Sequence, residues 1–137
     1  MSDDNAVDKL KNSIDAIQSH RDFEARRAAE QQRGVDEGWQ AVLRAARDLR
    51  DQLKDNPRLR YFVVALDRSE VSVRFEAKGS NSALLSLYRR HPEGRFPSIN
   101  AIWILEPGRK DRYVTSGDEA VEALVYHCAV NMTREDD

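Results

Sequence analysis

Three histidines and one cysteine are the side chains best suited to metal binding or nucleophilic catalysis: His20, His91, His127 and Cys128. His127 and Cys128 are neighbours on a predicted helix, where successive side chains diverge by about 100°, so they cannot form a close nucleophile–base pair. Cys128 falls on the apolar stripe of that helix, which indicates a small buried hydrophobic residue. A zinc site would need His91 to converge with this pair, and the spacing does not favour one. We predict no catalytic residue, no metal ligand and no cofactor.

Asp118 and Glu122 share one face of the same predicted helix, at positions i and i+4, where two carboxylates can act as an acid–base pair. Acidic residues are common at helix starts because they complement the positive end of the helix, and we favour this simpler interpretation. The signature motifs of phosphate binding, dinucleotide binding and zinc proteolysis do not occur in the sequence. An enzyme or small-ligand binder with a pocket between sheet and helix is therefore only a third hypothesis.

Basic side chains gather in the middle of the chain, close to aromatic ones. Residues 58–112 contain eleven basic and six acidic residues, whereas both flanking segments are acidic and the whole chain has a net charge of -2. Cations beside aromatic rings are typical of surfaces that bind single-stranded nucleic acid. An acidic surface of a partner protein would complement the same positive charges. The candidate contact residues are Arg74, Lys78, Arg89, Arg90, Arg95, Arg109, Lys110 and Arg112.

An apolar seam runs along the first predicted helix, with the 3–4–3 spacing of a coiled coil over two heptads. Its members are Val7, Leu10, Ile14 and Ile17. Charged residues follow at Arg21 and Glu24, where the seam ends. The seam can be buried by a second apolar series in residues 35–53 or by the same helix of a second chain. We predict the second arrangement, a homodimer with these four residues at its interface.

The second apolar series indicates further helix. Its members are Val35, Trp39, Val42, Ala46, Leu49 and Leu53. Gly34 and Gly38 lie between the two series and favour a break, and Pro57 ends the helical region because the residue before proline avoids helical geometry. We predict two helices, at about residues 5–32 and 36–55, with one long helix as the alternative.

The hydrophobic period changes to two after residue 58. Apolar and polar side chains alternate in residues 70–78, which indicates a half-buried antiparallel strand. We expect Val71, Val73 and Phe75 to lie under a helix, and Arg74, Glu76 and Lys78 to face solvent or a partner. Residues 83–90 are compatible with a strand or a short helix, and we pair them as a strand. The predicted strands cover residues 60–67, 70–78, 83–90, 98–106 and 112–115.

The last predicted helix begins at a capping box, in which Ser116 caps the helix and Glu119 reaches back to it. An apolar stripe at helical spacing is expected to face the sheet. Its members are Val121, Leu124, Val125, Cys128 and Met132.

These elements predict an α+β fold: an N-terminal helical hairpin or long helix, an antiparallel β-meander of four to five strands, and a C-terminal amphipathic helix packed on the sheet. We expect one compact unit with two parts. The first is a helical or coiled-coil segment, residues 1–57, and the second is the β-meander with the C-terminal helix, residues 58–137. The 137 residues suit a single domain, and one cysteine excludes an intrachain disulfide framework. No apolar run reaches the length of a membrane span, and the first residues do not resemble a signal peptide, so we expect a cytoplasmic protein with no membrane partner.

The leading functional hypothesis is a non-enzymatic protein-interaction module, such as an adaptor, small chaperone or regulator, that acts as a homodimer and binds another protein. The alternative is a nucleic-acid-binding regulatory protein that uses the basic segment of residues 58–112.

Overall fold

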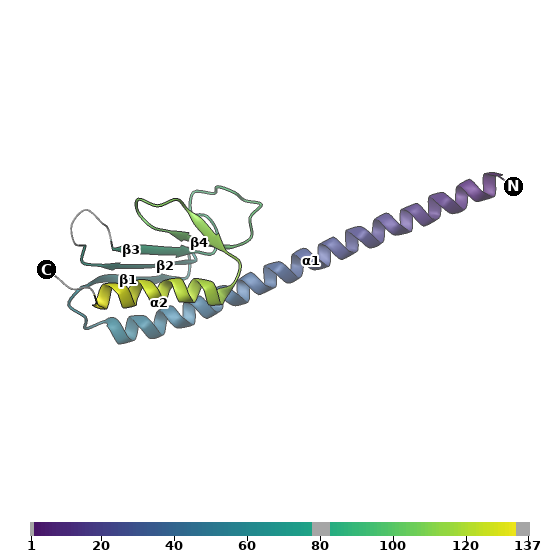
Figure 1. The fold of residues 1–137 in the computed structure, drawn as a ribbon. Helices are drawn as coiled ribbons and strands as arrows, with labels where there is room; N and C mark the ends of the chain where they lie inside the picture. Colours follow the sequence, from purple (N-terminus) through teal and green to yellow (C-terminus); the bar gives the residue numbers. More distant parts are fainter. Residues whose placement is uncertain (1, 78–82, 134–137) are drawn as a thin grey trace. The chain divides into compact units, whose positions relative to one another are not determined.

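The computed structural model describes residues 2–77 and 83–133 of the chain. By internal contacts, Met1–Arg33 and Gly34–Asp137 form two units. The elements are α1 (Ser2–Leu53), β1 (Leu59–Ala65), β2 (Glu70–Phe75), β3 (Leu84–Tyr88), β4 (Ile102–Leu105), β5 (Arg112–Val114) and α2 (Gly117–Thr133). Figure 1 shows this order of helix, sheet and helix, and the predicted α+β class is confirmed.

Helix α1 continues through Gly34 and Gly38 without interruption, so the predicted break between two helices is wrong and the single long helix is correct. A glycine inside a helix costs only about 0.5–1 kcal/mol relative to alanine, which strong helix formers on both sides readily offset. Gly38 has a packing role instead, because a Cβ atom added there would lie 2.8 Å from the backbone nitrogen of Gly117. Gly38 therefore marks the place where α1 and the start of α2 touch through their backbones.

The predicted end of the first helical region is confirmed just before Pro57. The backbone N–H of Asn56 donates to the carbonyl of Leu53 at 2.9 Å, and the side-chain oxygen of Asn56 accepts the N–H of Arg58 at 2.9 Å. This turn directs the chain into β1.

The sheet is an antiparallel meander with the strand order β1-β2-β3-β4-β5. Residues 84–88 form a strand, as predicted, and pair with β4 after a turn in which the N–H of Gly94 donates to the carbonyl of His91 at 3.1 Å. Each of the five strands described is shorter than predicted. The largest differences are that β2 ends at Phe75 and that β4 begins at Ile102 rather than near residue 98.

The core lies between one face of the sheet and the two helices. Figure 1 shows α2 and residues 34–53 of α1 side by side along this face. Val71, Val73 and Phe75 are fully buried there, while Arg74 and Glu76 are exposed, as the alternation predicts. Lys78 lies outside the described residues.

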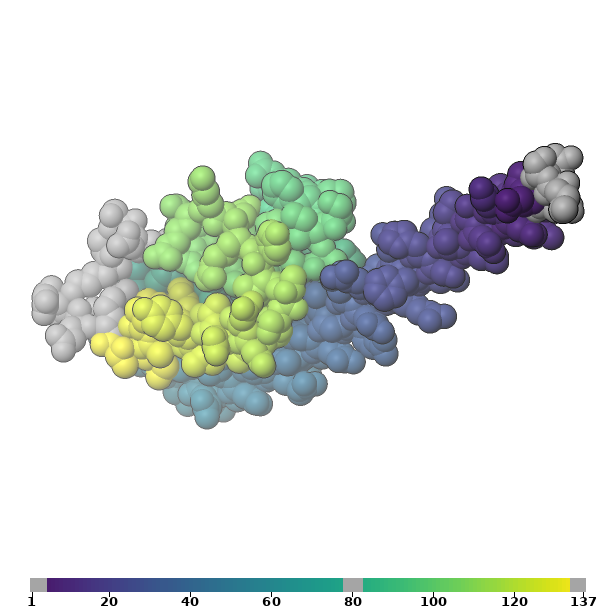
Figure 2. Space-filling model, turned by 45° about the vertical axis from the view of Figure 1, so that its right-hand side comes forward, coloured from purple at the N-terminus to yellow at the C-terminus, as the bar shows by residue number. Residues whose placement is uncertain are grey.

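Helix α2 is turned relative to the predicted stripe. Its buried residues are Ala120, Leu124, Cys128 and Asn131. Val125 and Met132, expected to face the sheet, are 44% and 43% exposed. The prediction is wrong for these two residues because α2 is apolar on nearly every side, so the pattern does not fix which side turns inward. Figure 2 shows α2, in yellow, at the surface of the molecule, where Tyr126 and Val130 are exposed as well.

Candidate interaction surfaces

The adjacent His127 and Cys128 do not form a reactive pair. Cys128 is 3% exposed, and burial raises the pKa of its thiol to about 11, so the thiol is protonated near neutral pH. Burial lowers the pKa of His127, so its imidazole is neutral there, and Nε2 lies 3.1 Å from the carbonyl oxygen of Ala83. A neutral imidazole in this position donates its Nε2–H to that carbonyl. Both side chains hold α2 on the sheet.

His91 is buried and binds through both ring nitrogens. The N–H of Glu93 donates to Nδ1 at 3.3 Å, so the ring proton lies on Nε2, which donates to Oδ2 of Asp111 at 2.8 Å. These bonds tie the turn after β3 to the start of β5. In residues 2–77 and 83–133 no group of three or more histidine, cysteine or acidic side chains is placed to hold a metal ion.

Arg89, a predicted contact residue, is buried and bound inside the protein. Its Nε and Nη2 lie 2.8 and 2.7 Å from Oδ1 of Asp36 on α1. Nη2 also donates to Oδ1 of Asn100 at 2.6 Å, and Nη1 to the carbonyl of Ala101 at 3.3 Å. The guanidinium therefore fastens α1 to the end of β3 and is not available at the surface.

Three other predicted contact residues form ion pairs at the surface. Arg95 lies 3.1 Å from Glu93, and both Arg109 and Arg112 lie 3.5 Å from Glu106. Exposed pairs of this kind contribute little stability, but they reduce the positive field of the segment. The other predicted cations that the structure describes are exposed: Arg74, Arg90 and Lys110.

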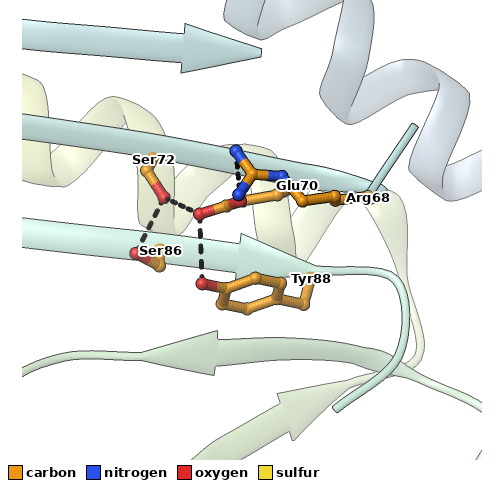
Figure 3. Close-up of polar contacts among 5 residues, drawn as sticks. All are labelled: Arg68, Glu70, Ser72, Ser86 and Tyr88. Atoms are coloured by element: carbon orange, nitrogen blue, oxygen red, sulfur yellow. Dashed lines mark hydrogen bonds and ion pairs between the residues drawn. The ribbon is translucent and has the colours of Figure 1, made fainter. Parts of the chain in front are cut away.

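A polar cluster that the sequence did not reveal lies on the sheet face opposite the helices (Figure 3). The Glu70 carboxylate accepts hydrogen bonds from Ser72 Oγ at 2.8 Å and from the Tyr88 hydroxyl at 3.1 Å. Arg68 lies 3.5 Å from the same carboxylate, and Ser72 and Ser86 share a hydrogen bond of 2.9 Å. Burial, followed by the contact with Glu70, raises the pKa of Tyr88. The strand register, which sets Glu70 opposite Tyr88, brings these residues together.

A cleft of about 570 Å³ adjoins this cluster, between residues 67–70 and 88–92. Its volume is within the range of ligand sites, but apolar walls usually accompany such sites. Here both signs of charge line the wall, with Asp67 and Glu70 beside Arg68 and Arg90. The negative carboxylates and positive guanidinium groups offset each other's charge, so the cleft favours neither an anion nor a cation.

Aromatic rings on the same sheet face pack against one another. Trp103 is 3% exposed and stacks on Phe96 with ring centroids 5.4 Å apart, while His91 and Tyr113 contact it at 4.9 and 5.1 Å. Phe96 adopts the left-handed backbone region, with φ 54°, in the segment that covers Trp103. The indole ring is therefore used internally and is not offered to a stacking base.

The four seam residues of α1 are all exposed. Every described side chain in residues 5–34 is classed as exposed, and the four seam residues retain between 44% and 60% of their accessible surface. The alternative in which residues 35–53 fold back as an intrachain hairpin to cover them does not occur, because α1 is one helix. Phe23, which the heptad pattern does not include, is also 62% exposed. A row of large apolar side chains in water is unusual for a monomeric protein.

No helix in the described part of the chain is long and apolar enough to cross a lipid bilayer. Comparison of the chain with known protein families, with curated proteins and with solved structures finds no match.

Proposed function

We propose that this chain is a non-enzymatic protein-interaction module that acts as a homodimer, joined through the apolar seam of α1. The observation that carries the proposal is the exposure of Val7, Leu10, Ile14 and Ile17 on one face of a helix. Two such helices can bury each other's seams by knobs-into-holes packing.

The size of the seam predicts a dimer of moderate affinity. Full burial of one such side chain contributes roughly 1.5–3 kcal/mol, and each is already about half covered by its own helix. Eight half-covered side chains from two chains therefore contribute about 6–12 kcal/mol, which is comparable to the association cost of about 4–15 kcal/mol. This balance favours a dimer that dissociates readily and can exchange partners.

Sedimentation of the full chain at several concentrations tests the proposal. Ile14→Asp combined with Ile17→Asp places charges in the seam and is expected to give monomers of 15.7 kDa, with the circular dichroism of the sheet unchanged. Phe23→Asp is the matched control, because Phe23 is equally exposed but lies outside the seam. A wild-type mass of 15.7 kDa throughout the micromolar range contradicts the proposal.

Nucleic-acid binding is the second candidate function. In its favour, Arg74 and Arg90 are exposed, and the strand register sets Arg74 on the sheet face opposite the helices. It is less well supported, because Arg89 is internal and several neighbouring cations are paired with glutamates. Arg74→Glu with Arg90→Glu should weaken oligonucleotide binding for any sequence, and wild-type binding should fall steeply with salt. No binding to single- or double-stranded oligonucleotides at low salt eliminates this function.

A further inference from the structure

We infer that the free edge of β1 binds a protein partner by strand addition, and that the partner is an extended segment with apolar residues at alternate positions and an acidic residue near one end. This inference rests on the interaction module proposed above and adds how its partner is held. β1 lies at one edge of the described sheet, where one side of its backbone pairs with no strand (Figure 1). Such an edge is a row of hydrogen-bond donors and acceptors with which another chain can pair.

The two edges of the sheet are protected to different degrees. Natural sheet edges avoid pairing by being short, charged, bulged or interrupted by proline. The edge at β5 is a strand of three residues that begins with Arg112. β1 is the longest of the five strands, with seven residues, and contains no proline. Its only charged residue is Arg60, and its only irregularity lies between Leu59 and Tyr61. Residues 61–65 are therefore a regular apolar edge.

The hydrogen bonds of β2 and of the residue after it show in which direction each backbone group points. The N–H of Phe75 donates to the carbonyl of Ala83, on the side of β3, at 3.0 Å. The N–H of Glu76 donates to the carbonyl of Arg58, on the side of β1, at 2.7 Å. Backbone groups alternate in direction along an antiparallel strand, so the even-numbered residues of β2 bond to β1.

The strand register then assigns the two sides of β1. The even-numbered residues of β2 lie opposite the odd-numbered residues of β1 from Tyr61 to Ala65. These residues use the inner side of the strand, so the N–H and C=O groups of Phe62 and Val64 point outward. Within residues 2–77 and 83–133, neither residue forms a backbone hydrogen bond outside the strands. Both side chains pack in or against the core, so a partner meets their backbones alone.

The side chains beside the free edge determine which partner residues fit. Tyr61 and Val63 lie on the sheet face opposite the helices and are 39% and 38% exposed, and Ala65 continues this row. Alternate side chains of an added strand would lie next to this row. Cross-strand pairs of aromatic and β-branched residues are favourable, so we expect apolar residues at alternate positions of the partner.

The exposed Arg74 adds a preference for negative charge. It lies opposite Tyr61 on the same sheet face and forms no ion pair with another described residue. Neighbouring strands are about 4.8 Å apart, so an added strand would lie about 10 Å from β2. The long side chains of an arginine and a glutamate together span this distance. An acidic partner residue beside Tyr61 would therefore complement the charge of Arg74.

Peptide selection tests the inference with the full chain. A displayed library of random seven-residue peptides, which match the length of β1, is screened against the purified protein. The selected peptides should have apolar residues at alternate positions and an acidic residue near one end. Arg74→Glu should raise the Kd of the acidic peptides several-fold, and an unchanged Kd would contradict the acidic preference. A screen that selects no peptide would overturn the inference.

A proline variant tests whether the outward backbone is used. Val64→Pro removes the outward N–H and no N–H that bonds to β2, and proline is tolerated at edge positions of this kind. It should raise the Kd of a selected peptide roughly tenfold. Val64→Ala is the matched control, because it shortens the same side chain and keeps the N–H. Equal Kd values for wild type and a folded Val64→Pro protein, with folding checked by circular dichroism, contradict strand addition.

Methylated peptides give a second test that does not depend on the folding of a variant. Methylation of every second backbone nitrogen of a selected peptide produces two versions, one for each side of an extended strand. Only one version should lose its affinity, because an added strand bonds through one side. Equal affinities of the two versions for the wild-type protein would overturn the inference.

Hydrogen exchange identifies the occupant of the edge. The amides of Phe62 and Val64 should exchange quickly in the free protein and slowly with a selected peptide, whereas the amide of Val63 should exchange slowly in both. Slow exchange that appears only at high protein concentration would assign the edge to a second copy of this chain. Slow exchange at every concentration would mean that the chain covers its own edge. Either result overturns the inference.

The outcomes separate this inference from the proposed dimer. Peptide binding is measured in wild type and in the Ile14→Asp, Ile17→Asp variant, because the seam belongs to α1 and not to the sheet. Monomers at every concentration that bind peptide along β1 contradict the dimer and support strand addition. Dimers that bind no peptide overturn strand addition and leave the dimer intact.

Discussion

Arg89, directly after β3, and Asp36 on α1 are separated by 53 positions in the sequence and are joined by two contacts to one carboxylate oxygen. The arginine side chain is 8% exposed and the aspartate 54% exposed, so the pair lies at the edge of the core. This contact fixes α1 against the sheet immediately after the exposed part of the helix.

Removing the carboxylate of Asp36 should destabilise the protein, because within residues 2–77 and 83–133 the buried Arg89 guanidinium would keep only the Asn100 side chain and the Ala101 carbonyl as acceptors. We expect Asp36→Ala to lower the free energy of unfolding by about 1–3 kcal/mol in urea denaturation. Glu37→Ala is the control, since Glu37 is an exposed neighbour on the same helix. Equal effects of the two substitutions would show that the ion pair contributes nothing specific.

The close approach of Gly38 and Gly117 gives a second prediction. A Cβ atom on Gly117 would lie 2.5 Å from the Gly38 Cα, and neither backbone can yield without moving a helix. Gly38→Ala and Gly117→Ala should each lower the unfolding temperature, at a cost of about 1–3 kcal/mol. Gly34→Ala should instead stabilise the helix by about 0.5–1 kcal/mol, because nothing lies within 4 Å of an added Cβ there. Stabilisation by all three substitutions would contradict the packing described.

Phe75 tests the assignment of the two sheet faces. It is fully buried beneath the helices, so Phe75→Ala should lower the free energy of unfolding by about 3–5 kcal/mol. Val63 points to the opposite face and is 38% exposed, so Val63→Ala should cost less than about 1 kcal/mol. Chemical denaturation of both variants measures the difference, and similar losses would mean that both faces are equally packed.

His127 makes stability depend on pH in a defined direction. Burial lowers its pKa below the ordinary value of 6.5, so as the pH falls through 6.5 the unfolded chain takes up a proton before the native protein does. The stabilisation that the buried, neutral His127 contributes is complete above pH 6.5 and is lost as the pH falls below it. We expect His127→Gln to lose less stability than wild type between pH 7 and pH 5, measured by urea denaturation. Identical pH profiles for the two proteins would refute this role.

Local patterns predicted most of the secondary structure, because turns and caps act within a few residues. Helix α1 ends at Leu53, four residues before Pro57. Ser116 immediately precedes α2, and its carbonyl accepts the N–H of Ala120 at 3.3 Å. The predicted helix break at Gly34 and Gly38 was wrong. A glycine is needed at position 38 because the backbone there contacts Gly117, which is distant in the sequence, and no local pattern reveals such a contact.

The interaction surfaces were predictable only where a periodic pattern on one element defines them. The seam of α1 is such a pattern. The link between Asp36 and Arg89 and the cluster of Glu70 with Tyr88 depend instead on how distant segments pack and on strand register. The exposed position of Val125 was not predictable for the same reason: where a helix is apolar on nearly every side, only packing against the sheet decides which side turns inward.

The two tryptophans of the chain lie on opposite sides of the sheet. Trp39 is buried in the core beneath it, and Trp103 is buried among the rings on the other side. Trp39→Phe and Trp103→Phe would each leave a single tryptophan. The fluorescence of that tryptophan would report on its own surroundings, because indole emission depends on the local environment. The protein thus contains two optical reporters, one sensitive to the separation of α1 from the sheet and the other to the lifting of the segment around Phe96.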